Sequence, residues 1–162
     1  MAHDNGELSV LDFKVIKEFW DAYQLIDGTK LKNRVILTGV KKLNRNKKDN
    51  KTIYNTNSNN YANEYEFDFQ SIQSFIFSEK SKGKSHTKQY TKQEIESSYN
   101  IETPFNTISE KWNEYVINDD GTKLKLKSTV TQIQKSEIVL QNGDPIYNVR
   151  IKILSKIIRP KI

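Results

Sequence analysis

Alternating apolar and polar residues predict a β-strand directly after Asp120-Gly121. The apolar positions of this stretch share one face, and the polar positions share the other. The first set is Leu124, Leu126 and Val130, and the second is Lys123, Lys125, Lys127, Thr129 and Thr131. A period of two residues with one apolar face is typical of a half-buried strand. Asp-Gly between two runs rich in aromatic and β-branched residues indicates a hairpin whose turn requires a positive φ.

The same pattern occurs earlier in the chain, around Asp27-Gly28. Residues 16–55 align with residues 108–148 when one residue is inserted before the second Asp-Gly. The recurring positions include Trp20 and Trp112 and the whole block Asp-Gly-Thr-Lys-Leu-Lys. We interpret this self-similarity as an internal duplication of one supersecondary unit. A duplication concerns the fold and does not by itself indicate a function.

The first copy departs from strict alternation after its Asp-Gly. Lys30, Lys32 and Arg34 keep the polar face, but Ile36 and Val40 then appear on that same face. We therefore expect a twist, a β-bulge or cover from another segment at this point.

The arm before each Asp-Gly has two readings. Trp20 and Tyr23, like their counterparts Trp112 and Tyr115, fit a strand, but they also stand at helical spacing. Thr107 and Glu110 have the spacing of a capping box, so a short helix could lead into the hairpin.

A third strand is expected after each hairpin. In the second copy, residues 146–153 alternate clearly, whereas the corresponding stretch of the first copy is Ile53-Tyr54-Asn55. A further strand then places Tyr65, Phe67 and Phe69 inward and Glu64, Glu66 and Asp68 outward. A polar loop follows from Ser78, and Thr91 and Glu94 predict a capping box for a short helix extending to Tyr99.

Together these patterns predict a mainly β protein with one or more short helices. The internally duplicated hairpin-plus-strand unit is expected to pack as a barrel or a sandwich. The repeats cover about 14–60 and 104–158, and an insert at 61–103 separates them within a single domain of residues 1–162. A unit of about 40 residues rarely stabilises itself, so the two copies should share one core.

Composition excludes several kinds of chemistry. The 162 residues contain no Cys, so there is no disulfide, thiolate metal site or cysteine nucleophile. The two histidines, His3 and His86, have no partners at ligand spacing, and no nucleotide-binding or hydrolase motif occurs. We expect no metal, no cofactor and no enzymatic activity. No apolar run is long enough for a membrane helix, and the N-terminus lacks the pattern of a signal peptide, so we expect a cytoplasmic protein without membrane partners.

Three groups of residues allow both a chemical and a structural interpretation. Asp119-Asp120 could be an acid/base pair, but a turn is favoured because Asp is common before Gly in turns. Glu64, Glu66 and Asp68 could bind a cation, but cross-strand pairing with Lys30, Lys32 and Arg34 is favoured. Trp20 and Trp112 could stack on bases, but their equivalent positions favour a role as core anchors.

The positive charge is the remaining functional signal. The chain has 26 Lys+Arg against 20 Asp+Glu, a net charge of +6, and a pI of about 9.3. Both predicted copies are basic, which suits a polyanion. The candidate binding residues are the cations of the second copy and of the turn in the first: Lys123, Lys125, Lys127, Arg150, Lys152, Lys41, Lys42, Arg45, Lys47 and Lys48.

We therefore expect a non-enzymatic binding module that presents a basic β surface to nucleic acid or to an acidic protein. The alternative is a structural or assembly protein that forms homo-oligomers through exposed strand edges. The C-terminal run VRIKILSKIIRPKI is the segment expected to add to a neighbouring sheet.

Overall fold

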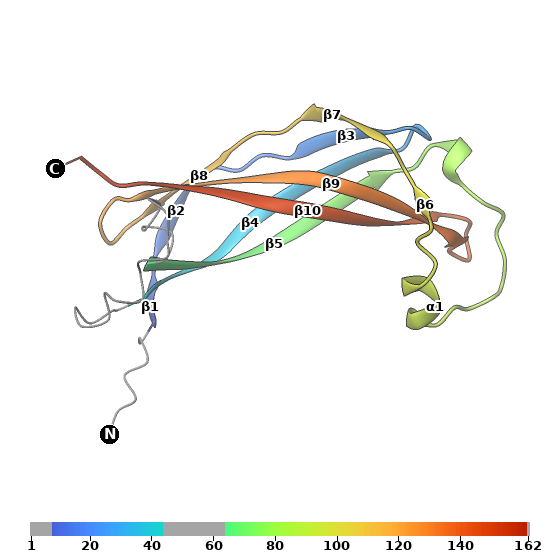
Figure 1. Ribbon diagram of the computed structural model, residues 1–162, viewed down its shortest axis with the longest axis horizontal. Helices are drawn as coiled ribbons and strands as arrows, with labels where there is room; N and C mark the ends of the chain where they lie inside the picture. The colour runs from blue at the N-terminus through green and yellow to red at the C-terminus, as the bar shows by residue number, and fades with distance from the viewer. Residues whose placement is uncertain (1–7, 44–63, 162) are drawn as a thin grey trace, which may run out of the picture.

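The computed structural model describes residues 8–43 and 64–161, which form a mainly β structure of two antiparallel sheets (Figure 1). In the first, sheet A, the long strand β4 pairs with β1, β3 and β5, and β3 also pairs with β7. Its strands are β1 (Leu8–Leu11), β3 (Asp21–Leu25), β4 (Lys30–Leu43), β5 (Tyr65–Ile76) and β7 (Phe105–Ser109).

The second sheet, sheet B, has the same pairing pattern around the long strand β9. This strand pairs with β6, β8 and β10, and β8 also pairs with β2. Its strands are β2 (Phe13–Lys17), β6 (Ile101–Glu102), β8 (Asn113–Ile117), β9 (Lys123–Val139) and β10 (Pro145–Ile158).

The two halves of the chain exchange strands. β2 precedes β3 in the chain but pairs with β8 in sheet B, whereas β7 precedes β8 but pairs with β3 in sheet A. The first half of the chain therefore supplies a strand to the sheet of the second half, and the second half supplies one to the sheet of the first.

Both Asp-Gly hairpins are present. Gly28 has a φ of 91° and Gly121 a φ of 75°, as the predicted turns require. The arms before these glycines are the strands β3 and β8, and β7 covers the stretch proposed as a helix start. The strand interpretation of these arms is therefore confirmed, and the helical alternative is wrong.

A β-bulge explains the broken alternation after Asp27-Gly28. Leu31, Val35 and Leu37 are buried at every second position, and the register with β5 then shifts before Val40, which is also buried. The extra residue rotates the following side chains by one position, so Val40 returns to the core face. β9 and β10 have a comparable register shift beside Thr131, which alternation alone did not indicate.

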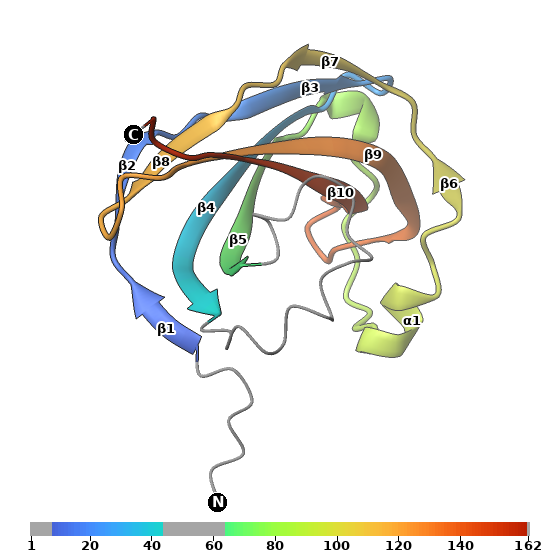
Figure 2. The same ribbon diagram turned by 60° about the vertical axis from the view of Figure 1, so that its left-hand side comes forward.

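The core consists of two clusters, and each contains residues from both sheets. One cluster contains Leu37, Val40, Tyr65, Tyr115, Ile117, Leu124 and Leu126. The other contains Tyr23, Leu25, Leu31, Val130 and Ile133. Figure 2 shows β4 and β5 facing β9 and β10 across this interior. Because each cluster needs both sheets, the two sheets enclose a common core.

The strand expected around Ile53-Tyr54-Asn55 lies outside the described residues. β5, which lies within the stretch predicted as an insert, pairs with β4 along most of its length. Tyr65 stands opposite Lys42, as Tyr147 stands opposite Lys135 in sheet B. Tyr65 is buried as predicted, but Phe69 remains 40% exposed.

The rest of the predicted insert packs at one end of the sheets. It contains a 3-10 turn, η3 (Glu79–Ser81), and one short helix, α1 (Lys92–Glu96). The predicted capping box is confirmed, since Thr91 and Glu94 exchange hydrogen bonds between side chain and backbone. The helix ends at Glu96 instead of reaching Tyr99. Within the described part of the chain, no helix has the length and apolarity needed to cross a membrane.

Candidate functional site

Six cations of β9 and β10 lie on the outer face of sheet B. On β9 the lysines alternate with the buried residues Leu124 and Leu126, so they point away from the core. On β10, Lys156 stands opposite Lys125, and Arg150 stands opposite Gln132. We call this surface the basic face and define it by Lys123, Lys125, Lys127, Arg150, Lys152 and Lys156.

Two neighbours partly balance the charge at one end of the basic face. Lys125 forms a salt bridge of 3.2 Å with Glu114 of β8. The hydrogen bond from Lys125 lowers the pKa of Glu114, and the charges of nearby lysines act in the same direction. The ring centre of Trp112 lies 4.6 Å from Lys156 Nζ and 5.9 Å from Lys127 Nζ. These contacts offset part of the repulsion between the directly opposed Lys125 and Lys156.

Toward the other end of the basic face, Arg150 and Lys152 have no such compensation among the described residues. Among the described residues, no carboxylate forms a salt bridge with Arg150 or Lys152. Lys123 lies at the end of the face where Glu114 is, and its charge contributes to the lowered pKa of Glu114. Arg150 and Lys152 are exposed on the edge strand β10. Their charges are therefore available to an anionic ligand.

The corresponding face of sheet A is different. Lys30, Lys32 and Arg34 occupy the same positions on β4, but they stand opposite Ile76, Ser74 and Ile72 of β5. The predicted pairing of these cations with Glu64, Glu66 and Asp68 is therefore wrong. The reason is register, because β5 runs on to Ile76 and its acidic residues lie at the far end of β4.

The acidic residues of β5 pair with other cations. Asp68 lies 3.5 Å from Lys41, and Glu66 stands opposite Lys41 in the sheet. Glu64 forms a salt bridge with Arg159. Each of these three carboxylates therefore has a cation beside it among the described residues.

Of the turn cations predicted within residues 41–48, the structure describes Lys41 and Lys42, and both lie beside carboxylates. Lys41 is paired with Asp68, and the charge of Lys42 contributes to the lowered pKa of Asp120. Arg45, Lys47 and Lys48 lie outside the described residues. The candidates of the second copy therefore form a shared surface, whereas Lys41 and Lys42 have local partners.

Neither tryptophan is a core anchor, which corrects the favoured prediction. Trp20 is 41% exposed, and Trp112 is half-buried beneath lysines. Each precedes a buried residue, Asp21 or Asn113, and successive residues of an extended chain point to opposite faces. Arg34 lies 5.8 Å above the ring of Trp20 and 3.2 Å from Glu18.

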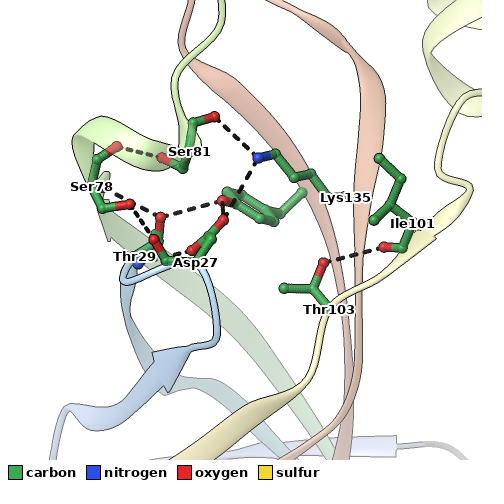
Figure 3. A network of polar contacts seen from close by, with 8 residues as sticks. Asp27, Thr29, Ser78, Ser81, Ile101, Thr103 and Lys135 are labelled. Atoms are coloured by element: carbon green, nitrogen blue, oxygen red, sulfur yellow. Dashed lines mark hydrogen bonds and ion pairs between the residues drawn. The ribbon is translucent and has the colours of Figure 1, made fainter.

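A polar network at the other end of the sheets ties three segments together (Figure 3). Asp27 accepts a hydrogen bond from the hydroxyl of Tyr147 and lies 3.7 Å from Lys135 Nζ. Lys135 also donates to the backbone carbonyl of Ser81 at 3.1 Å. Burial alone would raise the pKa of Asp27, but hydrogen bonds from Tyr147 and Thr29 outweigh it and hold the pKa below its usual value.

This network has a counterpart at the second Asp-Gly turn. Asp120 accepts hydrogen bonds from the Tyr65 hydroxyl at 3.2 Å and from the backbone N–H of Thr122 at 2.9 Å. Both carboxylates hold a hairpin against a neighbouring strand, which favours the turn interpretation of Asp120. Lys135 is engaged by Asp27 and does not extend the basic face.

Sequence reasoning did not identify two partly buried hydrogen bonds between the halves. The Tyr23 hydroxyl donates to Glu110 at 2.6 Å, and the Tyr115 hydroxyl donates to Glu18 at 2.7 Å. Burial, together with the adjacent carboxylate, raises the pKa of both tyrosines. The recurrence of Glu two residues before Trp was the available signal, but their partners depend on the exchange of β2 and β7.

Comparison with known proteins gives no functional lead, because no family model, curated protein or solved structure matches the chain. A function therefore has to be inferred from the side chains themselves.

Proposed function

We propose that this protein is a non-enzymatic binding module whose basic face binds a polyanion, and that nucleic acid is the ligand class that fits best. The supporting observation is the clustering of six cations on two paired strands, where Glu114 is the one carboxylate that pairs with them among the described residues. Such a surface concentrates positive potential where it meets solvent.

The spacing of the cations suits a regularly charged ligand. Side chains at every second position of a strand lie about 6.8 Å apart, and neighbouring strands are separated by about 4.8 Å. Lys123, Lys125 and Lys127 form one row on this grid, and the cations of β10 form a second. Phosphates along a nucleic acid strand can contact both rows, and Trp112 lies beside them as a surface for stacking.

Cross-strand repulsion supports a functional origin of the charges. Like charges directly opposite each other destabilise a sheet, and Lys125 and Lys156 are such a pair. A bound phosphate would relieve this repulsion. The free energy that the repulsion costs the unbound protein would then contribute to binding.

Binding of a labelled single-stranded DNA, followed by fluorescence anisotropy at about 50 mM salt, tests the proposal. The test variant carries Lys123→Gln, Arg150→Gln and Lys152→Gln, and the control carries Lys30→Gln, Lys32→Gln and Lys84→Gln. Both variants lose the same charge. We expect at least a tenfold loss of affinity in the test variant and less than a twofold loss in the control. Absence of binding by the wild type, or equal losses in both variants, contradicts the proposal. Binding to an acidic protein in place of nucleic acid contradicts the ligand class.

Assembly through strand edges is a second candidate function. Among the described residues, β5 pairs only with β4, and β10 pairs only with β9. β5 exposes Glu66 and Asp68, whereas β10 exposes Arg150 and Lys152, so the two edges are complementary in charge. Light scattering over a range of protein and salt concentrations separates the candidates. A concentration-dependent oligomer that forms without nucleic acid favours assembly, and high salt should weaken it if the opposite charges of the two edges contribute.

We also infer that the chain is one domain formed by internal duplication. Two observations support this inference. Residues recur in the two halves, and contacts between the halves occur in equivalent pairs. Phe13 makes an edge contact with Tyr115, and Phe105 makes one with Tyr23. Since β5 pairs with β4 as β10 pairs with β9, we extend the first repeat to about residue 76. On this interpretation the third strand diverged, becoming basic in one half and acidic in the other.

A further inference from the structure

An open groove of about 570 Å³ lies between the predicted insert and the tip of the β9–β10 hairpin. It is at the opposite end of β9 from Lys123 and Lys125 and is therefore separate from that part of the basic face. Most of its lining is apolar and comes from partly exposed side chains. These are Tyr90, Ile95, Ile138, Val139, Leu140 and Ile146.

The walls of the groove are held in place by backbone hydrogen bonds. Gly83 N–H donates to the carbonyl of Gly143 at 2.8 Å, and His86 N–H donates to the carbonyl of Gln141 at 2.9 Å. The His86 Nε2 atom lies 2.9 Å from the carbonyl oxygen of Val139. The backbone along this wall already has partners, which disfavours a peptide that would bind by strand addition. A ligand that uses side-chain contacts fits better.

The charge at the rim indicates which end of such a ligand would be polar. Among the described residues that line the groove, Lys88 is the one that is charged, and none is acidic. Its Nζ atom lies 4.8 Å from the ring centre of Tyr90, at the border of the apolar surface. The groove therefore complements a molecule with an apolar body and one negative end.

We propose that this groove binds a small amphiphilic carboxylate. The apolar chain lies against Ile95, Ile138 and Leu140, and the carboxylate accepts a hydrogen bond from Lys88. The volume is within the range of about 300–1,000 Å³ that small-molecule sites occupy, and an apolar lining with few polar groups is typical of them. This site does not depend on nucleic-acid binding by the basic face.

Isothermal titration calorimetry with decanoate below its micellar concentration tests the site, with decanol and decyltrimethylammonium as probes of the charge preference. We expect one saturable site with decanoate bound most tightly and decyltrimethylammonium most weakly. Lys88→Gln should lower decanoate affinity about two- to fivefold and leave decanol affinity unchanged, as loss of one exposed ion pair implies. Leu140→Asn should lower the affinity for both decanoate and decanol, because it removes apolar surface from the groove. Leu140 is 48% exposed, so it can be changed without opening the core.

Two controls make the result specific. Lys84→Gln removes a lysine from the same loop but outside the groove lining, and the basic-face variant removes three cations from elsewhere on the molecule. Both should bind decanoate as the wild type does. The proposal is overturned if the wild type shows no saturable site. It is also overturned if Lys88→Gln keeps the preference for decanoate, or if the basic-face variant abolishes binding.

Discussion

Asp21 is a buried carboxylate whose counterpart in the other half is an amide. Asp21 is 3% exposed and accepts a hydrogen bond from the backbone N–H of Lys111 at 3.1 Å. Asn113 accepts the corresponding bond from Phe19 at 3.0 Å. Burial raises the pKa of Asp21 to about 6, although the Lys111 N–H acts in the opposite direction. Both positions use a side-chain oxygen that accepts a backbone hydrogen bond, but Asn113 does so without a negative charge.

We expect Asp21→Asn to stabilise the protein at pH 7. The folded chain holds the Asp21 proton more tightly than the unfolded chain, so this group favours folding below pH 4. That contribution is lost as the pH rises through about 6. Removing the charge should raise the free energy of unfolding at pH 7 by about 1–3 kcal/mol.

Urea unfolding of the wild type and Asp21→Asn from pH 4 to pH 7.5 measures this effect. The difference between the two proteins should grow across this range and level off above about pH 6.5. A difference that does not change with pH, or a variant less stable at pH 7, would show that the Asp21 charge has no net cost.

At the scale of elements, the two Asp-Gly hairpins have the same turn geometry but different surroundings. A Cβ added to Gly28 would lie 3.1 Å from the Cβ of Ser78, whereas a Cβ on Gly121 would meet no atom within 4 Å. Both positions have a positive φ, which disfavours any side chain. The first hairpin is therefore packed against the segment after β5, and the second is open.

We expect Gly121→Ala to lower the free energy of unfolding by about 1–2 kcal/mol, the cost of a left-handed conformation for an L-residue. Gly28→Ala should cost more, because crowding against Ser78 adds to the same backbone strain. Denaturant midpoints of the two variants provide the comparison. Equal losses would show that the Ser78 contact is relaxed at no cost.

The hairpins, the bulge in β4 and the capped helix could be predicted from the sequence because each depends on neighbouring residues. The exchange of β2 and β7 could not, since both pair with strands about 80 to 100 residues away in the chain. The register of β5 was misjudged for a related reason. Its acidic start suggested a match to Lys30, Lys32 and Arg34, but the length of the strand places Ile72, Ser74 and Ile76 there instead.

At the scale of the whole molecule, strand exchange makes each half dependent on the other. β2 of the first half completes sheet B, and β7 of the second half completes sheet A. Both core clusters also combine the two sheets. Neither half can bury its apolar residues alone.

We therefore expect the fragments 1–84 and 85–162 to lack a cooperative unfolding transition when separate. Mixed in equal amounts, they should regain β-sheet circular dichroism and a single transition, because the broken bond lies between segments that still contact the hairpin tip. If either fragment unfolds cooperatively on its own, the chain consists of independent domains and the shared core is not required for folding.

The candidate site was predictable only in part. The lysine row on β9 follows from alternation, and its neighbours on β10 follow from the third strand. Glu114 and Trp112 also shape this surface, but charge counting along the chain does not reveal them, because they join the row only once β8 has paired with β9. The register between paired strands decides which charged residues share a face, and therefore the net charge of that face.

The salt dependence of nucleic-acid affinity tests the proposed function most directly. Each phosphate neutralised contributes about 0.7–0.9 to the slope of log K against log salt concentration. If the cations of the basic face contact phosphates, Lys123→Gln, Arg150→Gln and Lys152→Gln together should make the slope shallower by roughly two units. The control variant with Lys30→Gln, Lys32→Gln and Lys84→Gln should keep the wild-type slope. A wild-type slope near zero, or the same change in the control, would mean that these lysines only solvate the surface.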